Sequence, residues 1–165
     1  MLSRRQLLAA SPTTLPLFLA LSGCEGPAVL SAPPAVSAQT TMLLHAVTAE
    51  LNLIWIYDKA VAAYSGLGQA LTPLRAEHEE HLAQLRSRVI DPPGEHVPDT
   101  VTARPALGST QVAALRQLQA AEQAAVTTLM SRLDGASPSL AQLYASIAAS
   151  EATHASVLGA RIASS

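Results

Sequence analysis

The sequence has few aromatic residues and a single cysteine. Phe, Trp and Tyr make up 3% of its 165 residues, whereas Ala and Leu are abundant. Strands favour aromatic and β-branched residues and helices favour Ala and Leu, so this composition disfavours a sheet-rich fold and predicts an all-α one. The single cysteine, Cys24, excludes an internal disulfide.

Charged residues are also sparse, at 13% of the chain, and the formal net charge is −2. No basic face is present, so nucleic acid is excluded as an expected partner. The apolar stretch from Leu7 to Leu21 is interrupted by Ser11, Pro12, Thr13 and Thr14. It is therefore too short and too broken for a transmembrane helix.

Residues 1–23 instead have the order of parts found in an export signal. Arg4 and Arg5 give a positive start, the apolar stretch follows, and Leu21-Ser22-Gly23-Cys24 resembles the bacterial lipobox, whose cysteine takes a diacylglycerol. We predict a cleaved lipoprotein signal peptide and lipidation of Cys24; an ordinary signal peptide or an uncleaved anchor is the alternative. The Arg4-Arg5 pair also resembles the twin-arginine export motif, which leaves Sec and twin-arginine export both open.

Residues 24–40 are rich in Ala, Pro and Ser and lack helical periodicity. They are expected to form a tether that reaches about 50 Å when extended at ~3.1 Å per residue. The remaining residues, 41–165, are expected to form one domain. Together these features predict an exported protein, anchored through Cys24 to the outer face of the bacterial cytoplasmic membrane.

Within residues 41–165 the sequence predicts four helices: 41–64, a second that starts between Gly68 and Pro73 and ends near Ile90, 109–133 and 138–163. Thr72-Pro73 is expected to cap the second helix and Ser137-Pro138 the fourth. Residues 91–108 contain four prolines and two glycines and are expected to form a loop. Short, long and short connections are typical of a four-helix bundle built from two helical hairpins.

Each predicted helix carries an apolar stripe that Glu or His interrupts near its middle. The stripes are Leu43, Val47, Glu50, Ile54, Tyr57, Val61; Leu71, Leu74, His78, His81, Leu85; Leu115, Leu118, Glu122, Ala125, Leu129; and Leu140, Tyr144, Ile147, Glu151, His154, Leu158. The interruptions lie at heights that agree to about one turn, or ~5 Å. We therefore expect Glu50, His78, His81, Glu122, Glu151 and His154 to converge inside the bundle.

Buried carboxylates are costly, and three of them together would repel one another. A bound cation relieves both costs, and carboxylate with imidazole suits iron, manganese or zinc. One alternative is a metal-free network of protonated histidines paired with the glutamates, although such networks usually stabilise poorly. Another is that one or two of these side chains turn out to solvent.

These residues resemble the ferritin-like superfamily, whose four helices carry Glu, Glu-x-x-His, Glu and Glu-x-x-His. Glu50 matches the first, Glu122 the third and Glu151-Ala152-Thr153-His154 the fourth. On the second helix His81 matches the histidine of Glu-x-x-His, but His78 occupies the position of its glutamate. The chain is more narrowly similar to bacterial ferritin-like proteins of unknown function with His-x-x-His on the second helix.

The resemblance implies a ferritin-like bundle that binds iron, with ferroxidase, oxidant-handling or storage activity. With His78 in place of a bridging carboxylate, a mononuclear and a dinuclear site both fit. Glu77, Tyr57 and Tyr144 are candidates to hold the ligands in place, although core packing is the simpler role for the two tyrosines. No separate acid, base or nucleophile stands out, so whether the chain is an enzyme stays open.

The rival hypothesis is a non-catalytic envelope lipoprotein whose Glu/His network is structural or responds to pH or to a partner, because His titrates near neutrality. A second copy of the chain or another envelope protein is the partner that the sequence leaves open.

Overall fold

The computed structural model describes residues 36–90 and 96–165. These residues form four α-helices, α1 (Ala38–Ala63), α2 (Gly68–Arg86), α3 (Gln111–Ser131) and α4 (Pro138–Ala163), and two 3-10 helices, η1 (Ser65–Leu67) and η2 (Leu133–Gly135). No strand occurs in the described ranges, so the all-α prediction is confirmed. The predicted signal peptide, Cys24 and most of the predicted tether lie outside the described residues. None of the described helices is long and apolar enough to cross a membrane.

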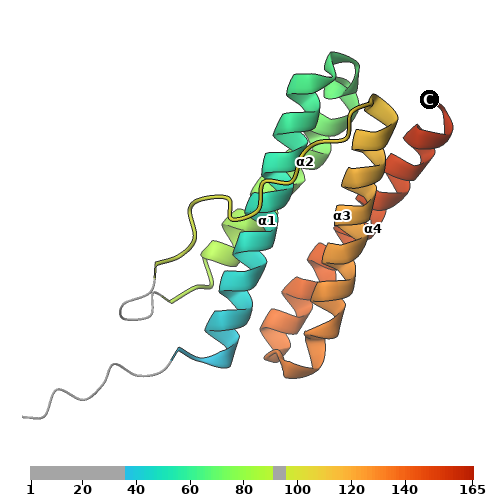
Figure 1. Cartoon of the computed structure of the whole chain (residues 1–165). Coiled ribbons are helices and arrows are strands. Elements are labelled where there is room, and N and C mark those ends of the chain that lie inside the picture. Colours follow the sequence, from blue (N-terminus) through green and yellow to red (C-terminus); the bar gives the residue numbers. More distant parts are fainter. Residues whose placement is uncertain (1–35, 91–95) are drawn as a thin grey trace, which may run out of the picture. The chain divides into compact units, whose positions relative to one another are not determined.

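The four helices are compatible with the expected four-helix bundle (Figure 1). α1 and α2 form one antiparallel hairpin, α3 and α4 form the other, and α1 packs against α3. The connection between α2 and α3 returns along α1, so that α3 starts at the end of the bundle where α1 finishes. α2 and α3 therefore run in the same direction.

Polar contacts hold the described part of this connection against the first hairpin. Asn52 of α1 accepts hydrogen bonds from the backbone N–H groups of Thr102 and Ala103, both at 3.2 Å. The hydroxyl of Tyr64, at the end of α1, donates to the carbonyl of Gly108 at 2.6 Å. These contacts lie at the middle and at one end of α1, so the connection follows that helix over about half of its length.

α1 begins three residues earlier than predicted. The Ser37 hydroxyl accepts a hydrogen bond from the Thr40 N–H at 3.0 Å and so caps a helix that starts at Ala38. This cap lies in the stretch predicted to be tether, because Ser and Ala there suit a helix start as well as a linker. α4 has the predicted bounds, with Pro138 in its first turn.

The start of the second helix lies within the predicted range of Gly68 to Pro73, but the expectation that Thr72-Pro73 caps the helix is wrong. α2 begins at Gly68, directly after η1, and Pro73 lies inside the helix. The proline has no N–H to donate to the carbonyl one turn back, which costs one hydrogen bond that packing of α2 must offset. α2 also ends at Arg86 rather than near Ile90. α3 is shorter than predicted, because Thr110 caps its start and its last turn gives way to η2.

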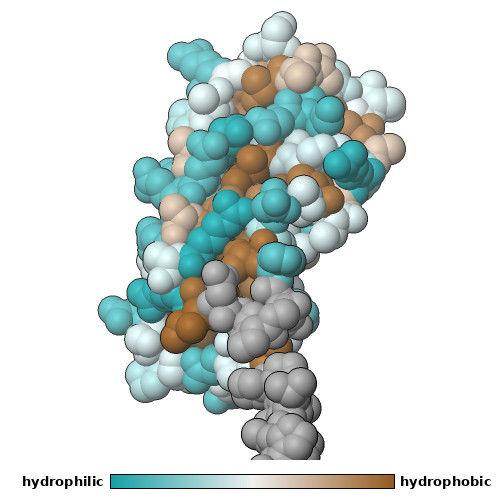
Figure 2. Space-filling view, turned by 90° about the vertical axis from the view of Figure 1, so that its left-hand side faces the viewer, coloured by the Kyte–Doolittle hydropathy of each residue, from teal (hydrophilic) through white to brown (hydrophobic). Residues whose placement is uncertain are grey.

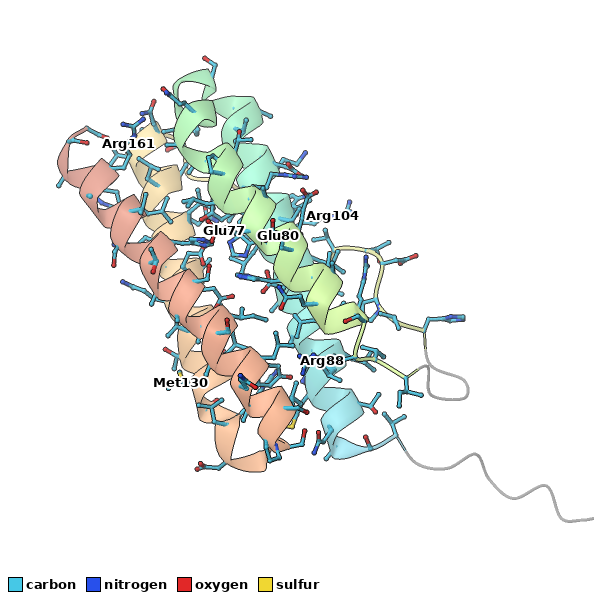
Figure 3. The ribbon with its side chains drawn as sticks, turned by 180° about the vertical axis from the view of Figure 1, so that it is seen from behind. Glu77, Glu80, Arg88, Arg104, Met130 and Arg161 are labelled. Atoms are coloured by element: carbon cyan, nitrogen blue, oxygen red, sulfur yellow. The ribbon has the colours of Figure 1, made fainter. Side chains whose placement is uncertain are left out.

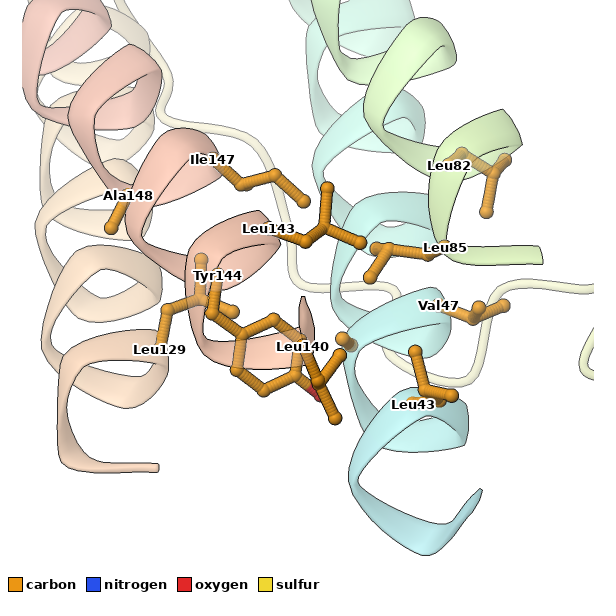
Figure 4. Close-up of a cluster of buried hydrophobic side chains, with 11 residues drawn as sticks. Leu43, Val47, Leu82, Leu85, Leu129, Leu140, Leu143, Tyr144, Ile147 and Ala148 are labelled. Atoms are coloured by element: carbon orange, nitrogen blue, oxygen red, sulfur yellow. The ribbon is translucent and has the colours of Figure 1, made fainter. Parts of the chain in front are cut away.

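The buried apolar residues form two clusters separated along every helix by a polar layer. Figure 4 shows the first cluster, which includes Leu43, Val47, Leu85, Leu129, Leu140, Leu143, Tyr144 and Ile147. The second includes Ile56, Tyr57, Leu67, Leu71, Leu74, Leu115, Leu118 and Leu158. The predicted stripes of α2 and α4 are buried throughout, but α1 buries Leu53 and Ile56 and leaves Ile54 only partly covered. On the face drawn in Figure 2, hydrophobic residues are confined to narrow bands between hydrophilic ones.

Candidate metal centre

All six residues expected to converge lie in the polar layer between the two apolar clusters. The most exposed of them, His81, has 8% of its surface accessible, and the other five have 2% or less. They form two groups that share one member. Ligand atoms of Glu50, His78, His81 and Glu151 lie within 4.8 Å of one another, and so do those of His78, Glu122 and His154. All four helices therefore contribute to one compact set of carboxylates and imidazoles.

His78 lies at the centre of the layer and links two carboxylates. Its Nδ1 is 2.8 Å from a carboxylate oxygen of Glu50, and its Nε2 is 2.9 Å from one of Glu122. Burial alone would lower the pKa of His78, but the hydrogen bonds and charges of Glu122 and Glu50 outweigh it and raise the pKa to about 10. In the metal-free protein this ring is an imidazolium at neutral pH.

Glu122 is held from two sides through the same oxygen. Oε1 accepts a hydrogen bond from the Tyr57 hydroxyl at 2.5 Å as well as the bond from His78. Burial would raise the pKa of Glu122, but its contact with His154 and its hydrogen bonds with His78 and Tyr57 lower that pKa to about 2. Burial and the Glu122 charge raise the pKa of Tyr57 well above its ordinary value, so Tyr57 remains a hydroxyl donor. Oε2 of Glu122 has no hydrogen-bond partner.

Glu151 lacks any such support. Burial, and then the charges of Glu50 and Glu122, raise its pKa to about 9, and its Oε2 has no hydrogen-bond partner. Glu50, by contrast, has a lowered pKa, because its contacts with His78 and His81 outweigh burial. The metal-free layer at neutral pH thus contains two carboxylates on either side of one imidazolium and a third carboxyl group kept protonated.

His154 is oriented by Glu77, which sequence analysis placed beside the ligands. Nε2 of His154 is 3.0 Å from Oε2 of Glu77, and the Ser150 hydroxyl donates to that same oxygen at 2.8 Å. Figure 3 shows Glu77 on the side of α2 that faces α4. The hydrogen bond with His154 is the largest cause of the lowered pKa of Glu77. Because Nε2 is occupied, Nδ1 of His154 is left facing Glu122 at 3.6 Å.

Four buried polar atoms of the layer have no hydrogen-bond partner: Nδ1 of His81, Oε2 of Glu122, Oε2 of Glu151 and Nδ1 of His154. All four belong to the predicted ligands, and they come from three helices. An unpaired buried polar atom costs ~1–3 kcal/mol, and a cation among them would satisfy several at once. The donor set therefore fits a transition metal, and oxygen with imidazole ligands is common to iron, manganese and zinc sites.

The two tyrosines predicted to hold the ligands in place differ in their contacts. Tyr57 bonds to a predicted ligand, whereas the Tyr144 hydroxyl has no hydrogen-bond partner and lies in the apolar cluster of Figure 4. Sequence analysis missed Ser150, which holds Glu77. The only sequence feature that points to Ser150 is its position one helical turn before His154. Many serines on helix surfaces lie one turn from a histidine without any such role.

Comparison of the chain with protein-family models, with curated proteins and with solved structures found no match.

Proposed function

We propose that this chain is a ferritin-like protein that binds a transition metal, with iron as the first choice, in the layer between its two apolar clusters. The ligands would be drawn from Glu50, His78, His81, Glu122, Glu151 and His154. The observation that carries the proposal is that, of the five buried side-chain atoms without a hydrogen-bond partner in the described residues, four belong to this set.

The shared His78 bears on how many ions bind. Its two nitrogens face different carboxylates, and it is a member of both ligand groups. The two overlapping groups allow one ion or two ions per chain. Manganese and zinc suit the same donors, so the identity of the metal is a separate measurement.

The chain's own residues would prepare the site. Tyr57 fixes one oxygen of Glu122 and leaves the other free, and Glu77 fixes Nε2 of His154 and leaves Nδ1 free. Such outer contacts orient ligands and commonly change metal affinity 10–100-fold, roughly. Iron held here would supply one-electron chemistry with dioxygen or a peroxide as oxidant. The resemblance thus makes Fe(II) oxidation or removal of an oxidant the activity to test.

The proposal extends to location. The lipobox-like Leu21-Ser22-Gly23-Cys24 supports lipidation at Cys24 and a membrane-tethered protein of the bacterial cell envelope. Labelling with a radioactive fatty acid, compared between the natural chain and Cys24→Ser, tests this part independently. Label retained by Cys24→Ser would contradict it.

Elemental analysis of protein prepared without chelators tests the metal proposal. The Glu151→Ala/His154→Ala variant should lose the metal, and a matched variant of two exposed residues, His45→Ala/Glu80→Ala, should keep it. Metal absent from the natural chain and both variants would reject the proposal. Fe(II) added in air, followed by ferric absorbance, then separates a ferroxidase from a passive binder.

A rival function is favoured by one observation, the good geometry of the Glu50–His78–Glu122 hydrogen bonds without a metal. In that case the layer is a structural or pH-responsive network of a non-catalytic envelope protein. It predicts no bound metal and no change of melting temperature when metals are added, which is the opposite of the first proposal.

A further inference from the structure

A cavity of about 320 Å³ opens between α1 and α3 and ends against the polar layer. Its walls are mostly apolar and include five alanines, Ala46 and Ala49 of α1 and Ala121, Ala124 and Ala125 of α3. Ala103 and Pro105 of the long connection form part of its rim. Small side chains facing one another on adjacent helices leave space that larger residues would fill. The cavity is within the size range of sites for small organic ligands.

Two of the proposed metal ligands form part of the cavity wall. Glu50 and Glu151 line it, together with Leu53 and Ile56. A molecule in the cavity would therefore lie beside the layer in which we place the metal.

One end of the cavity carries a positive charge. Arg132, which follows α3, lines the cavity next to Leu129. Its guanidinium lies 3.5 Å from Nδ1 of His45, and no acidic side chain in the described ranges forms an ion pair with it. From Ala121 to Arg132 the wall extends along α3 by ~16 Å at 1.5 Å per residue. The cavity is thus long and apolar, with an unpaired cation at one end.

We propose that this cavity binds a slender apolar molecule with an anionic end group, such as a medium-chain carboxylate. The anionic group pairs with Arg132, and the apolar chain lies between Ala49 and Ala125 with its far end toward Glu50 and Glu151. The cationic end selects the anion, and the alanine walls exclude a branched or bulky chain. The claim that the chain end lies beside a metal rests on the proposed function; binding to the cavity does not.

Decanoate is a suitable probe, with decylamine as a probe of equal length and opposite charge. The full chain with Cys24→Ser, which removes the predicted acyl attachment, avoids detergent that would compete for the cavity. Titration calorimetry should show binding of decanoate but not of decylamine, both in metal-free protein and in protein loaded with Co(II). Arg132→Gln and Ala125→Leu should each weaken decanoate binding about tenfold or more, which corresponds to ~1.4 kcal/mol.

Matched variants show whether the effect belongs to the cavity. Arg116→Gln and Ala145→Leu change exposed residues that do not line it, and they should bind decanoate as the natural chain does. Equal binding of decanoate and decylamine, or equal weakening by the matched variants, would overturn the proposal.

Co(II) binding and its visible spectrum separate this inference from the proposed function. Co(II) binding without decanoate binding rejects the cavity proposal alone, and decanoate binding without Co(II) binding rejects the metal proposal alone. Decanoate that binds to Co(II)-loaded protein should shift the Co(II) absorption bands, and an unchanged spectrum would contradict the placement of the chain end. Sedimentation of a dimer that Ala125→Leu dissociates, without decanoate binding, would show that a second copy covers the cavity instead.

Discussion

Glu77 lies 3.0 Å from Nε2 of His154 and so leaves the other ring nitrogen of that histidine unpaired inside the bundle. A half-exposed carboxylate on α2 thereby sets which nitrogen of a buried imidazole on α4 can bind a metal. Ser150 supports the arrangement by donating to the same oxygen of Glu77. Glu77 is therefore a positioning residue. Its replacement should change the metal affinity although no ligand is removed.

Replacement of Glu77 should therefore weaken metal binding. Glu77→Ala is expected to reduce Zn²⁺ affinity ~10–100-fold, and Glu77→Gln, which keeps an oxygen acceptor, should reduce it less. Competition with a coloured chelator measures both. Glu80→Ala, on the same helix and exposed, is the control and should leave affinity unchanged. Equal affinities of Glu77→Ala and the natural chain would show that the contact does not orient His154.

The two buried tyrosines allow the loss of a hydrogen-bonded hydroxyl group to be compared with the loss of an unpaired one. Tyr57→Phe removes a hydrogen bond to Glu122 and should lower the free energy of unfolding by ~1–2 kcal/mol. Tyr144→Phe removes a buried hydroxyl without a partner and should be neutral or slightly stabilising. Urea unfolding of the metal-free variants gives both values. A larger loss for Tyr144→Phe than for Tyr57→Phe would contradict the observed pairing.

The metal-free protein should become less stable as pH rises. The folded-state pKa of Glu151 is raised from 4.5 to about 9, so its contribution to stability is present below pH 4.5 and is lost as pH rises toward 9. His78, raised from 6.5 to about 10, adds a loss of the same sign above pH 6.5. Melting temperature should therefore fall between pH 5 and pH 9.

Glu151→Gln isolates the contribution of that carboxyl group. The variant cannot ionise at position 151, so its melting temperature should change little between pH 5 and 6.5. It should fall only above that, where His78 keeps its proton in the folded protein but loses it in the unfolded chain. A natural chain whose melting temperature rises from pH 5 to pH 9 would contradict the buried, protonated state of Glu151.

Metal binding should release protons from the same two groups, because a ligand must be deprotonated to bind. If only Glu151 gives up its proton, affinity at neutral pH should rise about tenfold per pH unit, and if His78 also becomes a ligand it should rise about a hundredfold. Zn²⁺ affinity measured from pH 6 to pH 8 gives the number released. A pH-independent affinity would exclude both residues as ligands.

Much of the fold and of the candidate site could be predicted from the sequence. The apolar stripe and the Glu and His residues that interrupt it are both clear on α2 and α4. Their polar faces are rich in Ser, Glu, Gln or Arg, so the buried stripe and its Glu and His interruptions stand out. α1 is apolar at most positions, and periodicity alone could not choose Leu53 and Ile56 over Ile54. Local preference also favoured Thr72-Pro73 as the cap of α2, whereas tertiary packing tolerates Pro73 inside the helix.

The contacts that complete the site were harder to foresee because they depend on how helices are rotated against one another. Glu77 sits among exposed acidic residues, and only the approach of α4 brings it to His154. The cavity beside Glu50 and Glu151 depends on alanines from two helices meeting across an interface. In the sequence those alanines are ordinary helix formers.

Anomalous X-ray scattering from a crystal soaked in Fe(II) or Zn²⁺, recorded above and below the absorption edge of the metal, tests the central claim most directly. The account predicts one or two peaks within bonding distance of Glu151, His81 or His154, inside the bundle. Peaks only at exposed carboxylates such as Glu80, with the Glu50–His78–Glu122 hydrogen bonds intact and no density in the layer, would contradict it.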